Sequence, residues 1–274
     1  NTYIKEPSMN HSFSCHCAQD ERQRFLQDIL LQKGYHAVAA ELASEQELAC
    51  NEVLSCKKII LLPVPVSEVM LKKMIPFFSK KHIILGGNLP KNFVTYCNEH
   101  EIACLDYMKI PEIAIENAVA TAEGAIFHAI QISKYTLHQS NCLVIGFGKC
   151  GEILADRLYG LKADVTVSTR DGRHKAKARS YGYDVPEVIP YETFAFLFNT
   201  APAKVITPSV IDRLSPDTVI IDIASHPGGV DYNYCIKKDI EARHCPGLPG
   251  KLSPKTSAEI IYKNICDLLQ NMTR

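Results

Sequence analysis

The sequence has no excess of charge of either sign, because 30 lysine and arginine residues balance 30 aspartate and glutamate residues. Binding to nucleic acid draws on counterion release from a basic face, which needs an excess of positive charge. The balance therefore argues against nucleic acid, or an anionic membrane surface, as the main partner. Long hydrophobic runs are also lacking. The longest, Lys58–Val66, has the length of a strand and carries two prolines, so we expect no membrane span.

Paired cysteine motifs are absent as well. The sequence has 11 cysteines, an odd number, with no CxxC pair and no visible secretory signal. Cys104 and Cys142 lie in apolar runs typical of strands, where a thiol behaves as a small hydrophobic group. The run Cys15-His16-Cys17 resembles a metal-ligand pair but lacks a second pair, so we expect no metal site. The pattern favours a protein of the reducing cytoplasm.

The order of the apolar runs predicts the fold class. Short apolar runs alternate with helical patterns along the chain, which is typical of α/β proteins with parallel sheets. Its 274 residues suffice for two domains. The helical pattern from Pro111 to about Ser133 has no strand of its own, and we interpret it as the connection between domains. The predicted domains are therefore residues 1–118 and 119–274.

Two patterns of apolar residues predict the individual elements. Apolar residues repeating every 3.6 residues indicate helices, and short apolar runs bounded by Gly or Pro indicate strands. In the first half we expect helices at 21–33, 69–78 and 93–100, and strands at 58–62, 82–85 and 102–105. In the second half we expect strands at 141–145, 164–168, 194–199 and 219–223, a weaker strand at 242–245, and a closing helix at 257–269 after a Pro- and Gly-rich stretch.

The clearest chemical signal is a glycine loop between a predicted strand and a helix. Its residues are Gly146, Phe147, Gly148, Lys149, Cys150 and Gly151. This context favours a dinucleotide-binding turn over a glycine-rich turn without a ligand. Gly146 permits the tight turn, Gly148 lets the backbone approach a pyrophosphate, and Gly151 lets the helix pack closely on the strand. The helix N-terminus then offers N–H groups and a partial positive charge to the phosphates.

The end of the next predicted strand bears on the choice of cofactor. An acidic residue there would accept hydrogen bonds from the ribose hydroxyls of NAD. Here the strand ends in Thr169 and Arg170, followed by four further basic residues between positions 173 and 177. A hydroxyl and a guanidinium suit a 2′-phosphate better, so we predict NADP, with NAD as second choice. The alternative is that these basic residues form a solvated helix face.

Polar residues also follow the remaining predicted strands of the second half. In doubly wound sheets, ligands sit beyond the carboxyl ends of the strands. The fourth strand is followed by the cofactor-binding candidates Asn199, Thr200, Ala201 and Pro202. The fifth leads into Asp222–Gly229, and the stretch Pro246–Thr256 leads into the last helix. Each segment alone could be an ordinary turn, but their joint occurrence at successive strand ends favours a ligand site.

Four longer runs resemble the A subunit of dipicolinate synthase. They are Thr121–Ile126, Ile145–Gly151, Asp222–Gly229, and Pro246–Gly250 together with Ser253–Thr256. Their order and spacing resemble the family over at least residues 111–270. The resemblance extends more faintly into the first half through Asp20, Arg22 and Gln23. The combined pattern is specific, whereas the glycine loop alone would not identify a family.

This resemblance implies a sporulation enzyme of the mother-cell cytoplasm in a bacterium. The family's A subunit works with a flavoprotein-like B subunit, and together they make dipicolinate from a dihydrodipicolinate-level intermediate. The implied fold is two doubly wound α/β domains, as in formate, glycerate and alanine dehydrogenases. A flavodoxin-like N-terminal domain faces a Rossmann NAD(P)-binding domain across a cleft, and the last helix helps to join them. The expected partners are the B subunit, a small dicarboxylate substrate and, as an open alternative, further copies of the chain.

Three features of the sequence depart from the family pattern. The first strand, usually a clean apolar run leading into two glycines, is Ser12–Cys17 followed by Ala18 and Gln19. His226 stands where the family commonly has arginine. It would bind a substrate carboxylate weakly at neutral pH, because histidine is largely uncharged there. Cys150 replaces a small polar residue in the glycine loop.

The implied reaction is hydride transfer from a dihydropyridine dicarboxylate to NADP, with loss of a ring proton. The protein orients both rings and supplies charge complementarity to the two carboxylates. The candidate substrate ligands are Arg22, Ser225, His226, Lys255 and Thr256. We expect His226 to be the general base, with Asp222 or Glu123 as second choices. Glu123 has the alternative of being a surface carboxylate on the connecting helix.

Two other functions fit the same residues. One is a different small-acid dehydrogenase on this architecture, against which the lack of an Arg-rich substrate loop argues mildly. The other is a non-catalytic chain that binds the dinucleotide and positions a catalytic partner.

Overall fold

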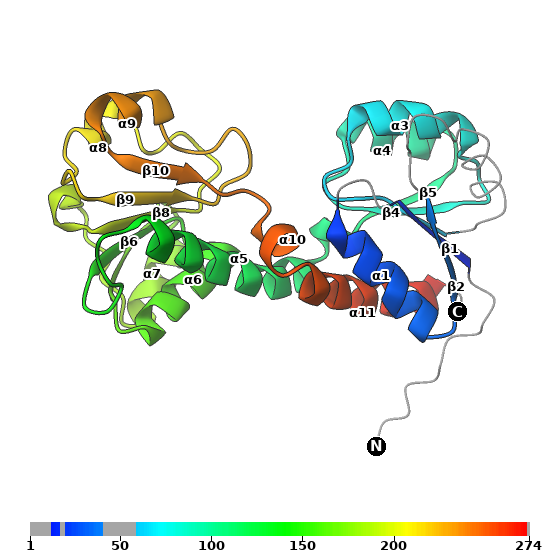
Figure 1. Ribbon diagram of the computed structural model, residues 1–274, viewed down its shortest axis with the longest axis horizontal. Helices are drawn as coiled ribbons and strands as arrows, with labels where there is room; N and C mark the ends of the chain where they lie inside the picture. Colours follow the sequence, from blue (N-terminus) through cyan, green and yellow to red (C-terminus); the bar gives the residue numbers. More distant parts are fainter. Residues whose placement is uncertain (1–11, 17–19, 41–58, 273–274) are drawn as a thin grey trace, which may run out of the picture. The chain divides into compact units, whose positions relative to one another are not determined.

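Two parallel sheets, each in its own unit, form the computed structural model (Figure 1). The structure describes residues 12–16, 20–40 and 59–272. One unit combines the residues up to Glu116 with those from Ser253 onward, and the other is Asn117–Leu252. The predicted division into 1–118 and 119–274 assigns the last helix to the second domain. In the structure this helix packs in the first unit.

The first unit has the strand order of flavodoxin-like proteins. Its parallel sheet runs β2-β1-β3-β4-β5, the 2-1-3-4-5 order of that doubly wound fold. The strands are β1 (Ser12–His16), β2 (His36–Ala40), β3 (Ile59–Leu61), β4 (Ile83–Gly86) and β5 (Ala103–Asp106). The helices are α1 (Glu21–Gln32), α3 (Glu68–Met74), α4 (Lys91–Glu99) and α11 (Pro254–Met272), with 3-10 turns η1 (Ile75–Phe77) and η2 (Tyr107–Lys109). Figure 1 shows α3 and α4 on one face of this sheet and α1 and α11 on the other.

The alternation of side chains along β3 explains why the last helix belongs to this unit. Ile59 and Leu61 face the cluster that includes Ile261 of α11, while Ile60 faces the cluster that includes Met70 of α3. All three strand residues are buried, as expected of a parallel strand covered on both faces. Ile261 is fully buried, and burying a side chain of this size contributes about 1.5–3 kcal/mol. Helix α11 therefore completes one side of the first core.

The second unit is a Rossmann-type sheet with the order β10-β9-β8-β6-β7. Its strands are β6 (Asn141–Ile145), β7 (Asp164–Ser168), β8 (Phe196–Asn199), β9 (Val219–Asp222) and β10 (Glu241–His244), all parallel. Its helices are α5 (Pro111–Ile132), which enters from the first unit, α6 (Lys149–Gly160), α7 (Gly172–Ser180), α8 (Pro208–Ile211), α9 (Tyr232–Lys238) and α10 (Leu248–Leu252), and the 3-10 turn η3 is Tyr191–Thr193. Figure 1 shows α5, α6 and α7 on one face, with α8 and α9 on the other.

The third strand of the usual Rossmann order is reduced to a single bridge. Thr166 of β7 pairs in parallel with Asp184, and the Val167 N–H donates to the Asp184 carbonyl at 2.8 Å. Counting that bridge, the sheet follows the 3-2-1-4-5-6 order of dinucleotide-binding folds. The chain reverses direction across the sheet between β6 and β8, which are neighbours. This switch point is where such folds bind ligands.

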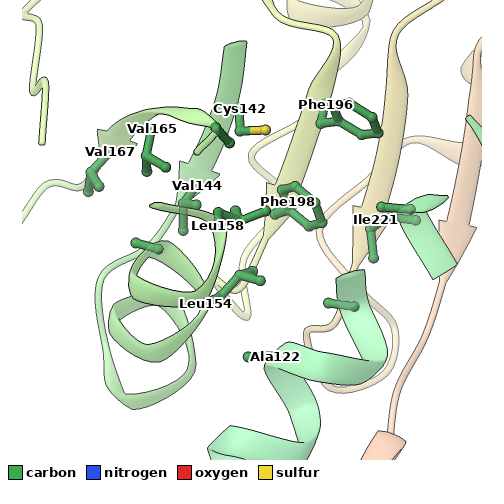
Figure 2. Packing of buried hydrophobic residues seen from close by; sticks show 14 of the residues in the cluster. Ala122, Cys142, Val144, Leu154, Leu158, Val165, Val167, Phe196, Phe198 and Ile221 are labelled. Atoms are coloured by element: carbon green, nitrogen blue, oxygen red, sulfur yellow. The ribbon is translucent and has the colours of Figure 1, made fainter. Parts of the chain in front are cut away.

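One of the two core clusters of the second unit lies between its sheet and helices α5 and α6, and the other includes Ile211 of α8 and Cys235 of α9. Val144 of β6 and Phe198 of β8 point toward Leu154 and Leu158 of α6, with Ala122 of α5 at the side (Figure 2). All five are fully buried. Ala122, Ala125 and Ala129 of α5 are fully buried in the same cluster, so small side chains line the α5 side of this core.

Most predicted elements are present within one to three residues of their expected ends, and several elements were not predicted. No sequence signal indicated β2, α8, α9 or the short helix α10, which contains Pro249 and Gly250. The predicted helix at 69–78 is confirmed as α3 followed by η1, with the change at Ile75-Pro76. The predicted α/β fold with parallel sheets is confirmed.

Two expected absences concern only the described residues. None of the helices described is long and apolar enough to cross a bilayer. No group of three or more His, Cys, Asp or Glu side chains suited to a metal ion occurs in the described part of the chain. Cys17, Ala18 and Gln19 lie outside the described residues, as do the side chains of Cys15 and His16.

Candidate functional site

The glycine turn is built around two close backbone contacts. Gly146 has a φ of +90°, a conformation that side-chain-bearing residues rarely adopt. A Cβ at Gly146 would collide with the Thr200 hydroxyl, and a Cβ at Gly151 would collide with the Gly146 carbonyl. The tight turn and the close packing of helix on strand predicted for these two glycines are therefore present.

Gly148 is the glycine that leaves space. No atom lies within 4 Å of the position that a Cβ would take there. Gly148 is the N-cap of α6, and no side chain caps this helix. In the described part of the chain, the amides of Lys149, Cys150 and Gly151 have no hydrogen-bond acceptor. Unpaired amides at the start of a helix, in front of an open backbone, form a site suited to phosphate.

The remaining residues of the loop have contrasting environments. Phe147 is buried and lies edge-on to Tyr183, with ring centroids 5.9 Å apart, so its side chain anchors the turn in the core rather than facing a ligand. Lys149 is exposed at the first position of α6. Cys150 is half-buried, and burial raises the pKa of its thiol. Only the backbone of this loop, together with Lys149, is therefore available to a cofactor.

The loop after β8 is tied to the end of β6. The Thr200 N–H and hydroxyl both donate to the Ile145 carbonyl, at 2.9 and 3.1 Å. Asn199 is fully buried. Its Nδ2 donates a hydrogen bond to the Ala201 carbonyl and its Oδ1 accepts one from the Ala201 N–H, both at 3.1 Å. Thr200 and Ala201 are half-buried, and Pro202 is exposed. Asn199 thus shapes the loop from inside, and the part of this candidate segment that reaches solvent begins with the half-buried Thr200.

Asp222 is the centre of a closed hydrogen-bond network. Its fully buried carboxylate accepts from Asn199 Nδ2 at 2.9 Å, Ala224 N at 3.0 Å, Gly229 N at 2.6 Å and Tyr232 Oη at 2.8 Å. Burial, followed by the hydrogen bond to Asp222, raises the pKa of Tyr232. A buried carboxylate that accepts four hydrogen bonds has its acceptor positions occupied and no open face. Asp222 therefore holds the 223–229 loop in place and is not positioned to act as a general base.

That loop presents Ser225 and His226 to solvent. Both residues are exposed, and the loop is closed by a hydrogen bond of 2.9 Å from the Gly228 N–H to the Ser225 carbonyl. The His226–Pro227 peptide bond is cis. The loop lies directly after β9, whose register with β8 pairs Asp222 with Asn199. Ser225 and His226 therefore stand at the carboxyl edge of the sheet.

His244 is a site residue that the sequence pattern did not reveal. It is the last residue of β10 and pairs with Asp222 in the sheet register. Its ring lies next to that of His226, with centroids 6.2 Å apart, and next to that of Tyr232 at 5.9 Å. Its Nε2 lies 2.9 Å from the Ala224 carbonyl. A lone histidine at the end of a weak strand carries no sequence signal, because its ring neighbours come from a loop and a helix elsewhere in the chain.

The segment after β7 leaves one cation unpaired. Thr169 is half-buried and Arg170 exposed, and no described residue pairs with the Arg170 guanidinium. Asp171, the acidic residue nearest this strand end, caps α7 by accepting from the N–H groups of Arg173 and His174 at 2.8 and 3.1 Å. These hydrogen bonds, the one from His174 first, lower the pKa of Asp171. Lys177 pairs with Glu152 of α6 at 2.7 Å.

Comparison with known proteins connects this geometry to a family. No protein-family model matches the sequence. The chain is 35% identical over 167 residues to the dipicolinate synthase A subunit of Bacillus subtilis, covering 58% of this chain and 54% of that protein. The matched region thus spans about half the length of this curated relative. The crystal structure of the dipicolinate synthase A subunit from Bacillus halodurans matches with a TM-score of 0.80 at 25% identity, covering 94% of this chain and 97% of that one.

The chain resembles the A subunit of dipicolinate synthase in sequence and in fold. This confirms the resemblance predicted from the four sequence runs. The apo-structure of D-lactate dehydrogenase from Escherichia coli also matches, with a TM-score of 0.70 at 12% identity over 95% of this chain and 97% of that one. At that identity the match concerns the fold alone, which is that of two-domain dehydrogenases.

The other predicted site residues lie in different surroundings. Arg22 is buried in the first unit, where its Nε pairs with Asp20 at 2.8 Å and its Nη2 donates to the Val64 carbonyl. It joins the start of α1 to the segment after β3, so two of its donor groups are already taken. Lys255 and Thr256 are exposed in the first turn of α11, and Glu123 is exposed on α5. Lys255 and Thr256 stay predictions, and the exposure of Glu123 agrees with the surface-carboxylate alternative.

Proposed function

We propose that the turn from Gly146 to Gly151 binds the pyrophosphate of a nicotinamide dinucleotide. The observation that carries this proposal is the uncapped start of α6 behind Gly148, where the backbone is open and three amides lack acceptors in the described part of the chain. The position at the β6–β8 switch point supports it, since ligands of doubly wound sheets bind there. The dehydrogenase fold of the structural neighbours supports it as well.

NADP is the proposed dinucleotide. Asp171, the nearest acidic residue to the end of β7, is occupied in capping α7, while Arg170 has no partner among the described residues. A free guanidinium after this strand suits a 2′-phosphate, which it can contact through two parallel hydrogen bonds. The test compares dissociation constants for NADPH and NADH by calorimetry.

Two arginine variants sharpen that test. R170A should weaken NADPH binding by about tenfold or more, the loss expected for a hydrogen bond to a charged group, and leave NADH binding unchanged. R173A is the matched control, because the Arg173 side chain is exposed and already faces Asp171. Tighter binding of NADH than NADPH by the wild-type chain would contradict the NADP assignment.

The proposed reaction is the oxidation of dihydrodipicolinate to dipicolinate. Two ring hydrogens leave the substrate, one as a hydride that the bound nicotinamide accepts and one as a proton that goes to a base. Among the predicted bases, His226 has the suitable environment, because it is exposed at the carboxyl edge of the sheet whereas Asp222 is enclosed by four donors. Ser225 beside it offers a hydroxyl to a substrate carboxylate. The resemblance to the dipicolinate synthase family supports this choice of substrate and a location in the cytoplasm of a sporulating mother cell.

A flavoprotein-like B subunit is the proposed partner, and it also defines the competing function. His226 is solvent-exposed and has no hydrogen bond to a described residue that would orient it, which favours a chain that needs a partner to complete its site. The test is dipicolinate formation from dihydrodipicolinate with NADP, measured by ultraviolet absorbance for the chain with and without the B subunit. Activity of the chain alone, lost in H226A with NADPH affinity retained, supports the catalytic function. Activity only with the B subunit, unchanged by H226A, supports the non-catalytic one.

A further inference from the structure

Two histidines meet at the carboxyl edge of the second sheet. His226 comes from the loop after β9 and His244 from the end of β10, and their ring centroids are 6.2 Å apart. His226 is exposed and His244 is half-buried, so a ligand can reach this edge from solvent. The pair is separated by 18 positions in the chain and is brought together by the pairing of His244 with Asp222.

The hydrogen bond of His244 fixes the role of its two ring nitrogens. Nε2 lies 2.9 Å from the Ala224 carbonyl oxygen, which can only accept, so Nε2 carries a proton. Nδ1 then has no partner among the described residues and can bind a further proton. Protonation at Nδ1 makes the ring a cation without disturbing the Ala224 contact. His226 has no hydrogen bond to a described residue.

The charges around the pair favour an anion. The groups that face His244 are His226 from the loop, Tyr232 from α9 and, behind Tyr232, Asp222 from β9. Tyr232 is neutral, and its hydroxyl hydrogen is used on Asp222. The Asp222 carboxylate is enclosed by its four donors and is screened from the edge. Of the described groups named here, the two imidazoles are the ones that a ligand can reach, and an imidazole that gains a proton is positively charged.

We infer that His226 and His244 together form a carboxylate-binding subsite whose affinity depends on pH. The inference rests on the proposed function, because the ligand it concerns is a ring bearing two carboxylates. Histidine changes charge between pH 5 and 8, whereas carboxylates of such ligands stay ionised across this range. The subsite is thus strong in mildly acidic solution and weakens as the pH rises. An arginine at the same place would hold its charge throughout.

The test measures the dissociation constant of pyridine-2,6-dicarboxylate for the full chain, by calorimetry in metal-free buffer at pH 6 and pH 8. For the wild type, we expect binding to weaken about tenfold or more between these values, because the charge of the imidazoles is lost. H244Q keeps a side-chain N–H that can bond the Ala224 carbonyl but cannot become charged. It should weaken binding at pH 6 by about tenfold and reduce the pH dependence, and H226Q should do the same.

The controls separate this inference from the dinucleotide proposal. H138Q removes an exposed histidine elsewhere in the second unit and should behave as the wild type. NADPH binding, measured for every variant, should not change, which also shows that each variant is folded. If H244Q keeps the wild-type affinity and pH dependence, His244 only orders the loop and the inference is wrong. If the wild type binds NADPH but shows no pH-dependent dicarboxylate binding, the inference fails alone, whereas absent NADPH binding refutes the proposed function.

Discussion

Replacing Gly148 by alanine should separate cofactor binding from stability. The added methyl meets no atom within 4 Å, and the backbone there (φ −81°) is accessible to alanine. Because alanine is a poorer N-cap than glycine, we expect a loss of folding free energy of about 1 kcal/mol or less. The methyl would occupy the space in front of the three unpaired amides. Losing one or two hydrogen bonds to a charged phosphate, at about 1.5–3 kcal/mol each, weakens NADPH binding by about tenfold to a thousandfold or more.

Replacing Gly151 by alanine is the matched comparison, because we expect it to lower stability. Its methyl would collide with the Gly146 carbonyl, so the turn must shift, and overpacking of this kind costs about 1–3 kcal/mol of stability. Urea denaturation gives the stability of both variants, and calorimetric titration with NADPH gives their affinities. The expected result is that G148A is nearly as stable as the wild type but binds poorly, while G151A is clearly less stable. Wild-type NADPH affinity in G148A would refute the placement of the pyrophosphate at Gly148.

Three further predictions concern buried or capping groups. D222N should lose about 1–3 kcal/mol in urea denaturation, since an amide nitrogen would face donors that need an acceptor, and equal stability would contradict the four-donor network. The pKa of Asp171 is lowered in the folded chain, so its capping contribution is present above the unfolded-state pKa and is lost as the pH falls through the folded-state pKa. The wild type should therefore have a higher melting temperature than D171N at neutral pH, and this difference should shrink in acid. Burial raises the pKa of Cys142 to about 12, so a thiol reagent at pH 8 should leave Cys142 unlabelled in the native chain and label it after unfolding, as read by mass spectrometry.

The elements that could be predicted from the sequence are those whose signal is local. The glycine turn could be recognised because strand, turn and helix follow one another within about 15 residues, and the apolar runs of β3, β6 and β9 are buried on both faces. Strand β2 (His36–Ala40) was missed because its alanines and histidine lack the branched side chains typical of strands. Helix α10 was missed because Pro249 and Gly250 usually end helices.

The parts of the site that could not be predicted depend on contacts between distant segments. Asp222 was a candidate base because it follows a strand, but its role is set by donors from Asn199, Gly229 and Tyr232, which no local pattern brings together. Arg22 was a substrate candidate because it is charged, but Asp20 and the Val64 carbonyl engage it in the structure. The placement of α11 in the first unit follows from the burial of Ile261 against β3 rather than from its position in the chain.

The burial of Phe147 places the glycine turn next to tyrosine rings whose fluorescence can be measured. Phe147 lies between the first two glycines of the turn, edge-on to the rings of Tyr181 and Tyr183, which follow α7. The chain contains no tryptophan, so its ultraviolet emission comes from tyrosine. We expect a nucleotide bound at the amides of α6 to change the surroundings of these rings. Occupancy of the turn can thus be followed as a change in tyrosine emission in the unlabelled protein, and Y181F should diminish that signal without altering the affinity.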